Sequence, residues 1–266
     1  MNMYLHELKS LRKSAIIWTC AMIALATLYF SVYPVIVTEA DDFKNLLGNY
    51  PASVRAMLGI SLDSITSLLG FYSMVFSFVT LCGAIQAMNL GLSILSKEAR
   101  ERTADFLLVK PVSRPDIVSA KLLAALTMLL ATNVIYNAAV FIIANIVKTS
   151  DFSSKVFFMI NLTMFFIQLI LLAIGVVVSV FFQKLKSVFP ISLGIVFGLY
   201  IIGALIATGK DDAARFLSPF KYFDNSYIIK NASYEIPYLI TGAVIIMVSI
   251  AASYIIYLKK DIHAVS

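Results

Sequence analysis

Six stretches of this sequence contain no Asp, Glu, Lys or Arg residue, and each is long enough to cross a membrane as one helix. A helix needs about 20 apolar residues to span about 30 Å of hydrocarbon. The uncharged stretches are 14–37, 67–95, 122–147, 156–182, 188–208 and 236–258. The strands of a membrane barrel would show short alternating runs instead. The sequence therefore predicts an all-α, polytopic membrane protein with six transmembrane helices in a single domain, residues 1–266.

The basic residues predict the orientation of these helices, because Lys and Arg accumulate in cytoplasmic loops. If both termini are cytoplasmic, 13 of the 21 Lys and Arg residues lie on the inner side. Six of the 15 acidic residues lie there too, so the inner face is net positive. We expect a multi-pass membrane protein, surrounded by membrane lipids, with both termini in the cytoplasm.

A short segment between the second and third stretches, residues 96–121, holds 10 of the 36 charged residues. Ser96 can N-cap a helix at about 97–109, which Pro111 would end. Ser113 and Asp116 then form a capping box that begins the third span near Arg114, so this span covers 114–147 and projects beyond the bilayer. A charged helix between two spans has no role toward lipid, and we expect it to contact another protein at the membrane surface.

The N-terminal segment before the first span predicts a separate helix lying along the inner leaflet. Tyr4, Leu8 and Leu11 recur at helical spacing, with charged residues between them. A frayed polar tail is the alternative. Cys20 and Cys82 both fall inside spans, where we expect them to act as small packing residues without a disulfide or a metal site.

Uncharged polar residues inside the spans are candidates for a substrate pathway. They include Gln86, Asn89, Asn133, Asn137 and Gln168. Such amides also form hydrogen bonds between helices, and both interpretations stay open. The lack of charged residues in the spans argues against an ion-coupled carrier or a charge-selective pore.

The motifs of several function classes are missing from the sequence. No G-x-S-x-G, H-E-x-x-H or Cys/His metal spacing is present, and residues 203–211 match a phosphate-binding loop only poorly. No basic stripe interleaves with exposed aromatic residues, so we expect no nucleic-acid partner. The chain is predicted not to be an enzyme by itself.

Two segments of the sequence carry a recognisable pattern. The first consists of Glu98, Glu101, Arg102-Thr103-Ala104-Asp105-Phe106-Leu107-Leu108, Pro111-Val112-Ser113-Arg114 and Lys121. The second is the aromatic loop Ser218-Pro219-Phe220-Lys221-Tyr222-Phe223-Asp224, which we also expect to pack on neighbouring spans or to enter the outer interface. Both segments resemble those of type-2 ABC exporter permeases of the bacterial cell membrane. Arg102 departs from the pattern, since the family commonly has Gly before the Thr.

The resemblance implies that residues 97–109 form a coupling helix that rests in a groove of a separate cytoplasmic ABC ATPase. It implies two ATPase copies that bind ATP and Mg, a second permease, identical or homologous, and no cofactor on this chain. The contacts would be made by Glu98, Arg100, Glu101, Arg102, Thr103, Asp105, Phe106, Leu107 and Leu108. It also implies export of an amphipathic or hydrophobic cargo, such as a peptide, antibiotic or lipid-like compound. The alternative is a membrane sensor or scaffold that docks a cytoplasmic regulator without transport.

Overall fold

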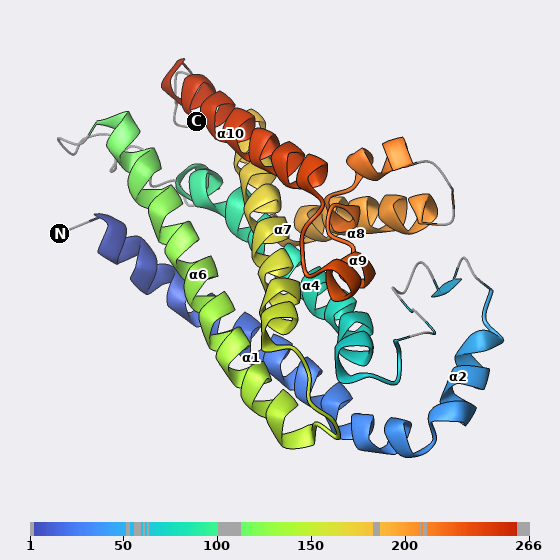
Figure 1. The fold of residues 1–266 in the computed structure, drawn as a ribbon. Coiled ribbons are helices and arrows are strands. Elements are labelled where there is room, and N and C mark those ends of the chain that lie inside the picture. Colours follow the sequence, from blue (N-terminus) through green and yellow to red (C-terminus); the bar gives the residue numbers. More distant parts are fainter. Residues whose placement is uncertain are drawn as a thin grey trace.

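The regular elements are all helices wherever the structure describes the chain (Figure 1). A computed structural model describes residues 3–51, 54–55, 60, 62, 64–100, 113–182, 187–207, 209 and 212–259, with their side chains except at 98–100, 114 and 259. In chain order the elements are α1 (Met3–Thr38), α2 (Ala40–Gly48), α4 (Leu68–Arg100), α6 (Arg114–Val147), α7 (Ser154–Phe181), α8 (Phe189–Ile206), η1 (Asp212–Leu217), η2 (Pro219–Lys221), α9 (Asn225–Asn231) and α10 (Ile236–Lys259). Six of these, α1, α4, α6, α7, α8 and α10, are long and apolar enough to cross a membrane. The predicted all-α fold with six transmembrane helices is confirmed.

Helix α6 begins at Arg114, the residue predicted from the sequence. Ser113 has an extended backbone, and its hydroxyl accepts a hydrogen bond from the backbone N–H of Asp116 at 3.3 Å. Pro115 occupies the first turn, where its missing N–H leaves no intrahelical bond unmade. The helix then continues for 34 residues, about 50 Å at 1.5 Å per residue.

The prediction that Ser96 begins a new helix is wrong. Helix α4 continues through Ser96 to Arg100, and the Ser96 hydroxyl donates to the Leu92 carbonyl at 2.6 Å. A serine inside a helix can satisfy its hydroxyl in this way, one turn back along the same helix. Residues 97–100 of the predicted coupling helix are therefore the last turn of α4, and 101–109 lie outside the described residues.

The N-terminal segment is not a separate interfacial helix. Residues 3–13 are the first turns of α1, which runs unbroken to Thr38. These residues include neither Gly nor Pro, and Leu, Glu, Lys and Arg all favour helix, so nothing separates them from the span that follows. The alternative of a frayed tail is also wrong from Met3 onward.

Helices α4 and α7 form the centre of the bundle. About two thirds of the apolar window of α4 and 61% of that of α7 are buried, against 11% for α10. Their backbones approach closely where Gly91 meets Gly175, since a Cβ built on Gly91 would lie 3.1 Å from the Gly175 Cα. Helices α1 and α6 pack along each other on one side of this pair, while α8 and α10 lie on the other (Figure 1).

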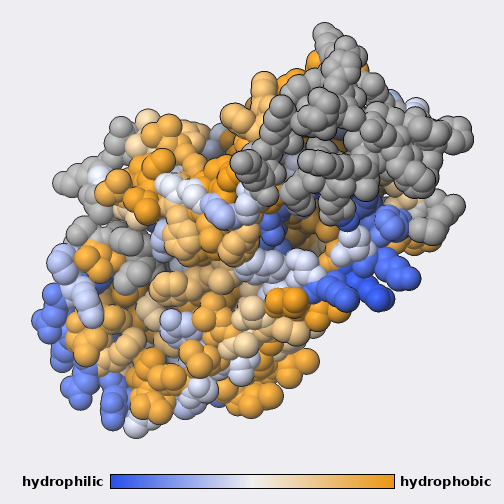
Figure 2. All heavy atoms as spheres, turned by 180° about the vertical axis from the view of Figure 1, so that it is seen from behind, coloured by the Kyte–Doolittle hydropathy of each residue, from blue (hydrophilic) through white to orange (hydrophobic). Residues whose placement is uncertain are grey.

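The two ends of the bundle differ in composition. We name the end where α1 begins, α4 ends and α6 begins the proximal end, and the opposite end, where α1 leads into α2, the distal end. Aromatic side chains fill the distal half of the core, with Phe30, Tyr72 and Phe157 stacked at centroid distances of 4.9–5.4 Å. Figure 2 shows hydrophilic residues gathered at two opposite edges, with mostly hydrophobic surface between them. This is the pattern of a membrane-spanning bundle.

Candidate functional site

The charged segment between α4 and α6 is anchored at the proximal end. Within this segment, residues 96–121, Arg100 is the last residue of α4 and Arg114 is the first residue of α6. Glu98 and Arg100 lie in the last turn of α4. The other predicted coupling residues are outside the described residues: Glu101, Arg102, Thr103, Asp105, Phe106, Leu107 and Leu108.

Lys121, the last residue of the charged segment, is buried and connects three helices. Lys121 of α6 is only 1% exposed, and its Nζ donates to the Ile94 carbonyl of α4 at 2.7 Å. The same Nζ lies 3.6 Å from Oε1 of Glu7 on α1, a carboxylate that is itself buried. Since an isolated buried charge is costly, this pairing is what allows both ions to stay inside the bundle.

A second polar group lies deeper in the bundle and links four helices. Asn133 of α6 donates through Nδ2 to Oε1 of Gln168 on α7 at 2.6 Å. Gln168 in turn donates to Oε1 of Gln86 on α4 at 3.3 Å, and Gln86 donates to the Thr132 hydroxyl at 3.2 Å. Thr19 of α1 reaches the same hydroxyl at 3.3 Å. We name these five residues the polar network.

The sequence that forms these six spanning helices matches the model of a known family. A family model described as "ABC-2 family transporter protein" matches residues 1–262 of this chain. The chain belongs to this family. No curated protein and no solved structure matches the chain significantly.

Membership makes this chain the membrane subunit of an ABC transporter, a permease that works with a cytoplasmic ABC ATPase. The family is defined by the membrane subunit and not by an ATPase domain. In the part of the permease that the structure describes, no group of three or more His, Cys, Asp or Glu side chains is placed to hold a metal ion.

The permease brings three of the five candidate pathway residues together. Gln86, Asn133 and Gln168 are buried members of the polar network, each bonded across to another helix. Asn137 lies one turn further along α6, where its Nδ2 donates to the Asn133 carbonyl and its Oδ1 has no hydrogen-bond partner. Asn89 is half-buried on α4 outside the network. For the three bonded residues, the cross-helix interpretation of the sequence fits the observed contacts.

Replacing Gln168 with Leu should destabilise the permease by about 1–2 kcal/mol, because interhelical hydrogen bonds in membranes contribute about 0.6 kcal/mol each on average. The change removes the acceptor of Asn133 and the donor to both Gln86 and the Gly83 carbonyl. The unfolding midpoint in detergent measures the loss.

Asn145→Leu on α6 is the matched control for this prediction. Asn145 is exposed, and its amide donates only to the Phe141 carbonyl of its own helix. The control should unfold like the parent. Equal midpoints for Gln168→Leu and the parent would show that the polar network does not hold the helices together.

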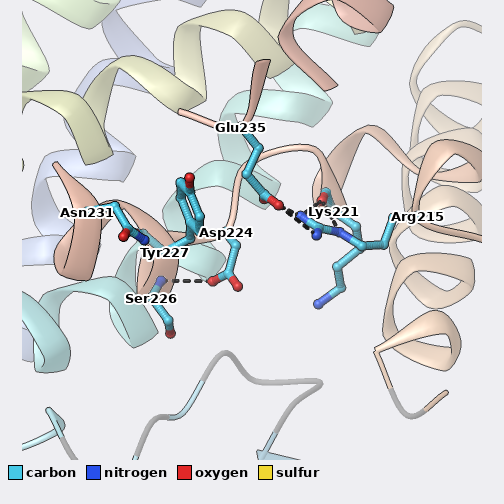
Figure 3. Close-up of polar contacts among 7 residues, drawn as sticks. All are labelled: Arg215, Lys221, Asp224, Ser226, Tyr227, Asn231 and Glu235. Carbon is cyan, nitrogen blue, oxygen red and sulfur yellow. Dashed lines mark hydrogen bonds and ion pairs between the residues drawn. The ribbon is translucent and has the colours of Figure 1, made fainter. Parts of the chain in front are cut away.

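The loop between α8 and α10 is fixed by an ion pair at the distal side of the permease. Arg215 of η1 donates through both terminal nitrogens to the Glu235 carboxylate, one of them at 3.0 Å, and it also donates to the Lys221 carbonyl (Figure 3). Its guanidinium lies 4.1 Å from the ring centroid of Tyr238 on α10. A bidentate arginine–carboxylate pair is geometrically specific, and here it fixes the loop between α8 and α10 in one conformation.

The aromatic loop packs on the spans, as one of the two sequence expectations stated. Phe223 contacts Phe166 of α7 at a centroid distance of 5.4 Å, and the buried Ser218 hydroxyl donates to the Leu199 carbonyl of α8. Burial lowers the pKa of Lys221, and the Arg215 charge adds to this effect while Asp224 opposes it. Figure 3 shows the Lys221 amine directed away from the Arg215–Glu235 pair.

Sequence reasoning missed Glu7, although a signal was present. Glu7 falls three residues after Tyr4 and four before Leu11, so it shares the apolar side of the helix rather than its charged side. The structure buries it there. An acidic residue on the apolar face of a helix indicates a buried partner, and here that partner is Lys121.

Proposed function

We propose that this chain is one half of the membrane channel of an ATP-driven exporter in the bacterial cell membrane. In this assembly the chain pairs with a second permease, a copy of itself or a homologue, and each permease rests on one cytoplasmic ATPase. The charged segment including residues 98–108 is the contact with the ATPase. The cargo is amphipathic or hydrophobic.

The position of the charged segment supports this proposal most directly. Both of its anchor points, the end of α4 and the start of α6, lie at the proximal end of the bundle. The proximal end also holds Lys9, Arg12 and Lys13, all exposed on the first turns of α1. Basic residues gather on the cytoplasmic side of membrane proteins, which is the side where ATP is available.

The polar groups inside the bundle favour a cargo without charge. The buried polar side chains described within the uncharged stretches of the six spans are amides and hydroxyls, and the buried ion pair of Glu7 and Lys121 lies at the proximal margin. A charged cargo would need a compensating charge along its route. An amphipathic molecule can instead use hydrogen bonds at Asn133 and Asn137, whose Oδ1 atoms are unpaired.

Reconstitution with an ATPase tests the function. The chain is co-expressed with its cognate ABC ATPase subunit, and the complex is purified and placed in inside-out vesicles. We expect the two proteins to purify together and to move hydrophobic fluorescent dyes or amphipathic peptides into the vesicles only with ATP. Copurification without ATP-dependent flux of any probe would favour the sensor or scaffold.

Cysteine labelling tests the orientation. In a background with Cys20 and Cys82 replaced by Ser, Lys9→Cys at the proximal end and Lys148→Cys at the distal end each provide one reactive thiol. We expect a membrane-impermeant maleimide added outside intact cells to label Lys148→Cys and not Lys9→Cys, because the net positive end faces the cytoplasm. The reverse pattern would place the charged segment out of reach of a cytoplasmic ATPase.

A further inference from the structure

Lys121 belongs to the segment that resembles the permease pattern, yet it does not lie on the surface where the ATPase would bind. Its ammonium is buried between three helices, donating to the Ile94 carbonyl of α4 and facing the Glu7 carboxylate of α1. Replacing a buried ion pair with apolar residues is often neutral or stabilising, so stability alone does not explain a lysine here.

The location of its acceptor suggests what this lysine does. The Ile94 carbonyl lies in the last two turns of α4, the end of a helix where partial negative charge favours a cation. Lys121 itself lies in the third turn of α6. The Lys121 ammonium therefore connects α4 and α6, the two helices between which residues 101–112 lie.

The first turns of α1 are held to the same pair of helices. Besides the contact of Glu7 with Lys121, Lys97 of α4 donates to the Ser10 hydroxyl at 2.8 Å. The Tyr4 hydroxyl lies 3.0 Å from that of Thr127 on α6. Among the described residues, these three contacts attach the start of α1 to α4 and α6, and the Lys121 contact is a buried ion pair.

We propose that Lys121 is a positioning residue in the transport cycle. Its contacts transmit a movement of residues 101–112 to α1. A displacement of residues 101–112 acts first on the end of α4 and the start of α6. Because the Lys121 ammonium bridges both helices and the Glu7 carboxylate, α1 follows them as part of one unit. Without the bridge, the first turns of α1 no longer follow α6 closely when the ATPase changes state. This inference rests on the proposed function.

The test uses Lys121→Met together with Glu7→Gln, which removes both charges of this pair. Leu11→Cys, in the background without Cys20 and Cys82, reports separation of α1, because Leu11 packs against the core beside α4 and α6. The rate of maleimide labelling is measured in the reconstituted complex, without nucleotide and with ATP and vanadate.

In the parent complex we expect slow labelling of Leu11→Cys in both nucleotide states. In the double variant we expect the nucleotide-trapped state to label about tenfold faster than the nucleotide-free state, a ratio within the usual range of a lost coupling. The complex should retain most of its ATP hydrolysis, since the ATPase contact is unchanged. Lys121→Arg with Glu7 intact keeps both charges and should leave the labelling rate of Leu11→Cys as in the parent.

Two further variants keep the proposal open to refutation. Glu7→Gln alone preserves the acceptor oxygen and should show a smaller effect in the same direction. Lys148→Met is the matched control, because its Nζ contacts only the exposed Asp151 at the distal end, and it should behave like the parent.

Labelling that rises equally in both nucleotide states, or not at all, would overturn the role of Lys121, since a purely structural contact has no dependence on nucleotide. A parent complex that does not hydrolyse ATP above the free ATPase would overturn the proposed function and this inference with it. The parent's own ATP hydrolysis therefore separates the two failures.

Discussion

Replacing Glu101 and Asp105 with Lys should abolish the stimulation of ATP hydrolysis by the permease while the protein still inserts into the membrane. Both residues belong to the segment that resembles a coupling helix. Reversing two charges at a protein interface introduces like-charge contacts that cost several kcal/mol, enough to reduce complex formation at least about a hundredfold. Copurification and the ATP hydrolysis rate of the mixture measure this loss.

The matched control reverses two acidic residues at the other end of the molecule. Asp41 and Asp42 are exposed in the first turn of α2, so Asp41→Lys with Asp42→Lys changes the net charge by the same amount. This control should bind and stimulate the ATPase like the parent. Normal coupling in the Glu101 and Asp105 variant would remove residues 101–105 from the ATPase contact.

Gly91→Ala should destabilise the permease by about 3 kcal/mol, at the upper end of the usual cost of overpacking a core. A Cβ on Gly91 would lie 2.4 Å from the Leu172 carbonyl oxygen and 3.1 Å from the Gly175 Cα, so the backbones of α4 and α7 must move apart. Side-chain rotation cannot relieve a contact with backbone atoms. The unfolding midpoint in detergent and the yield of folded protein measure the effect.

Gly194→Ala on α8 is the matched control, since a Cβ there has no other atom within 4 Å. Alanine favours helix over glycine by about 1 kcal/mol, so this substitution should be neutral or slightly stabilising. The two substitutions differ only in their surroundings, and of the two only Gly91→Ala should lower the stability. Equal effects would mean that α4 and α7 are not in close contact at Gly91.

The six membrane-spanning helices were predictable from the sequence because the membrane imposes a simple rule of length and charge. The start of α6 was also predictable, since Ser113 and Asp116 satisfy backbone amides locally. Ser96 has the same side chain as Ser113, yet it lies inside a helix. The two serines differ in the chain that precedes them. Before Ser96 the chain is already helical, so the Leu92 carbonyl can accept a hydrogen bond from the Ser96 hydroxyl.

The contacts between helices were less predictable. The sequence identified Gln86, Asn133 and Gln168 as unusual polar residues, but their partners depend on how each helix is rotated about its axis. That rotation is set by close packing such as the Gly91–Gly175 contact, which no local pattern reveals. The partnership of Glu7 and Lys121 crosses more than 100 residues of sequence and depends on the same packing.

The contact of α4 with α7 also limits how this molecule can change shape. The backbones of α4 and α7 are in contact, so these helices cannot slide or rotate past each other without separating. We therefore expect them to move together as one rigid unit at the centre of the bundle. In the proposed exporter, the movement that opens the route to one side or the other would then come from α8 and α10, which pack against this pair. The sparsely buried α10 has the least packing to give up in such a movement.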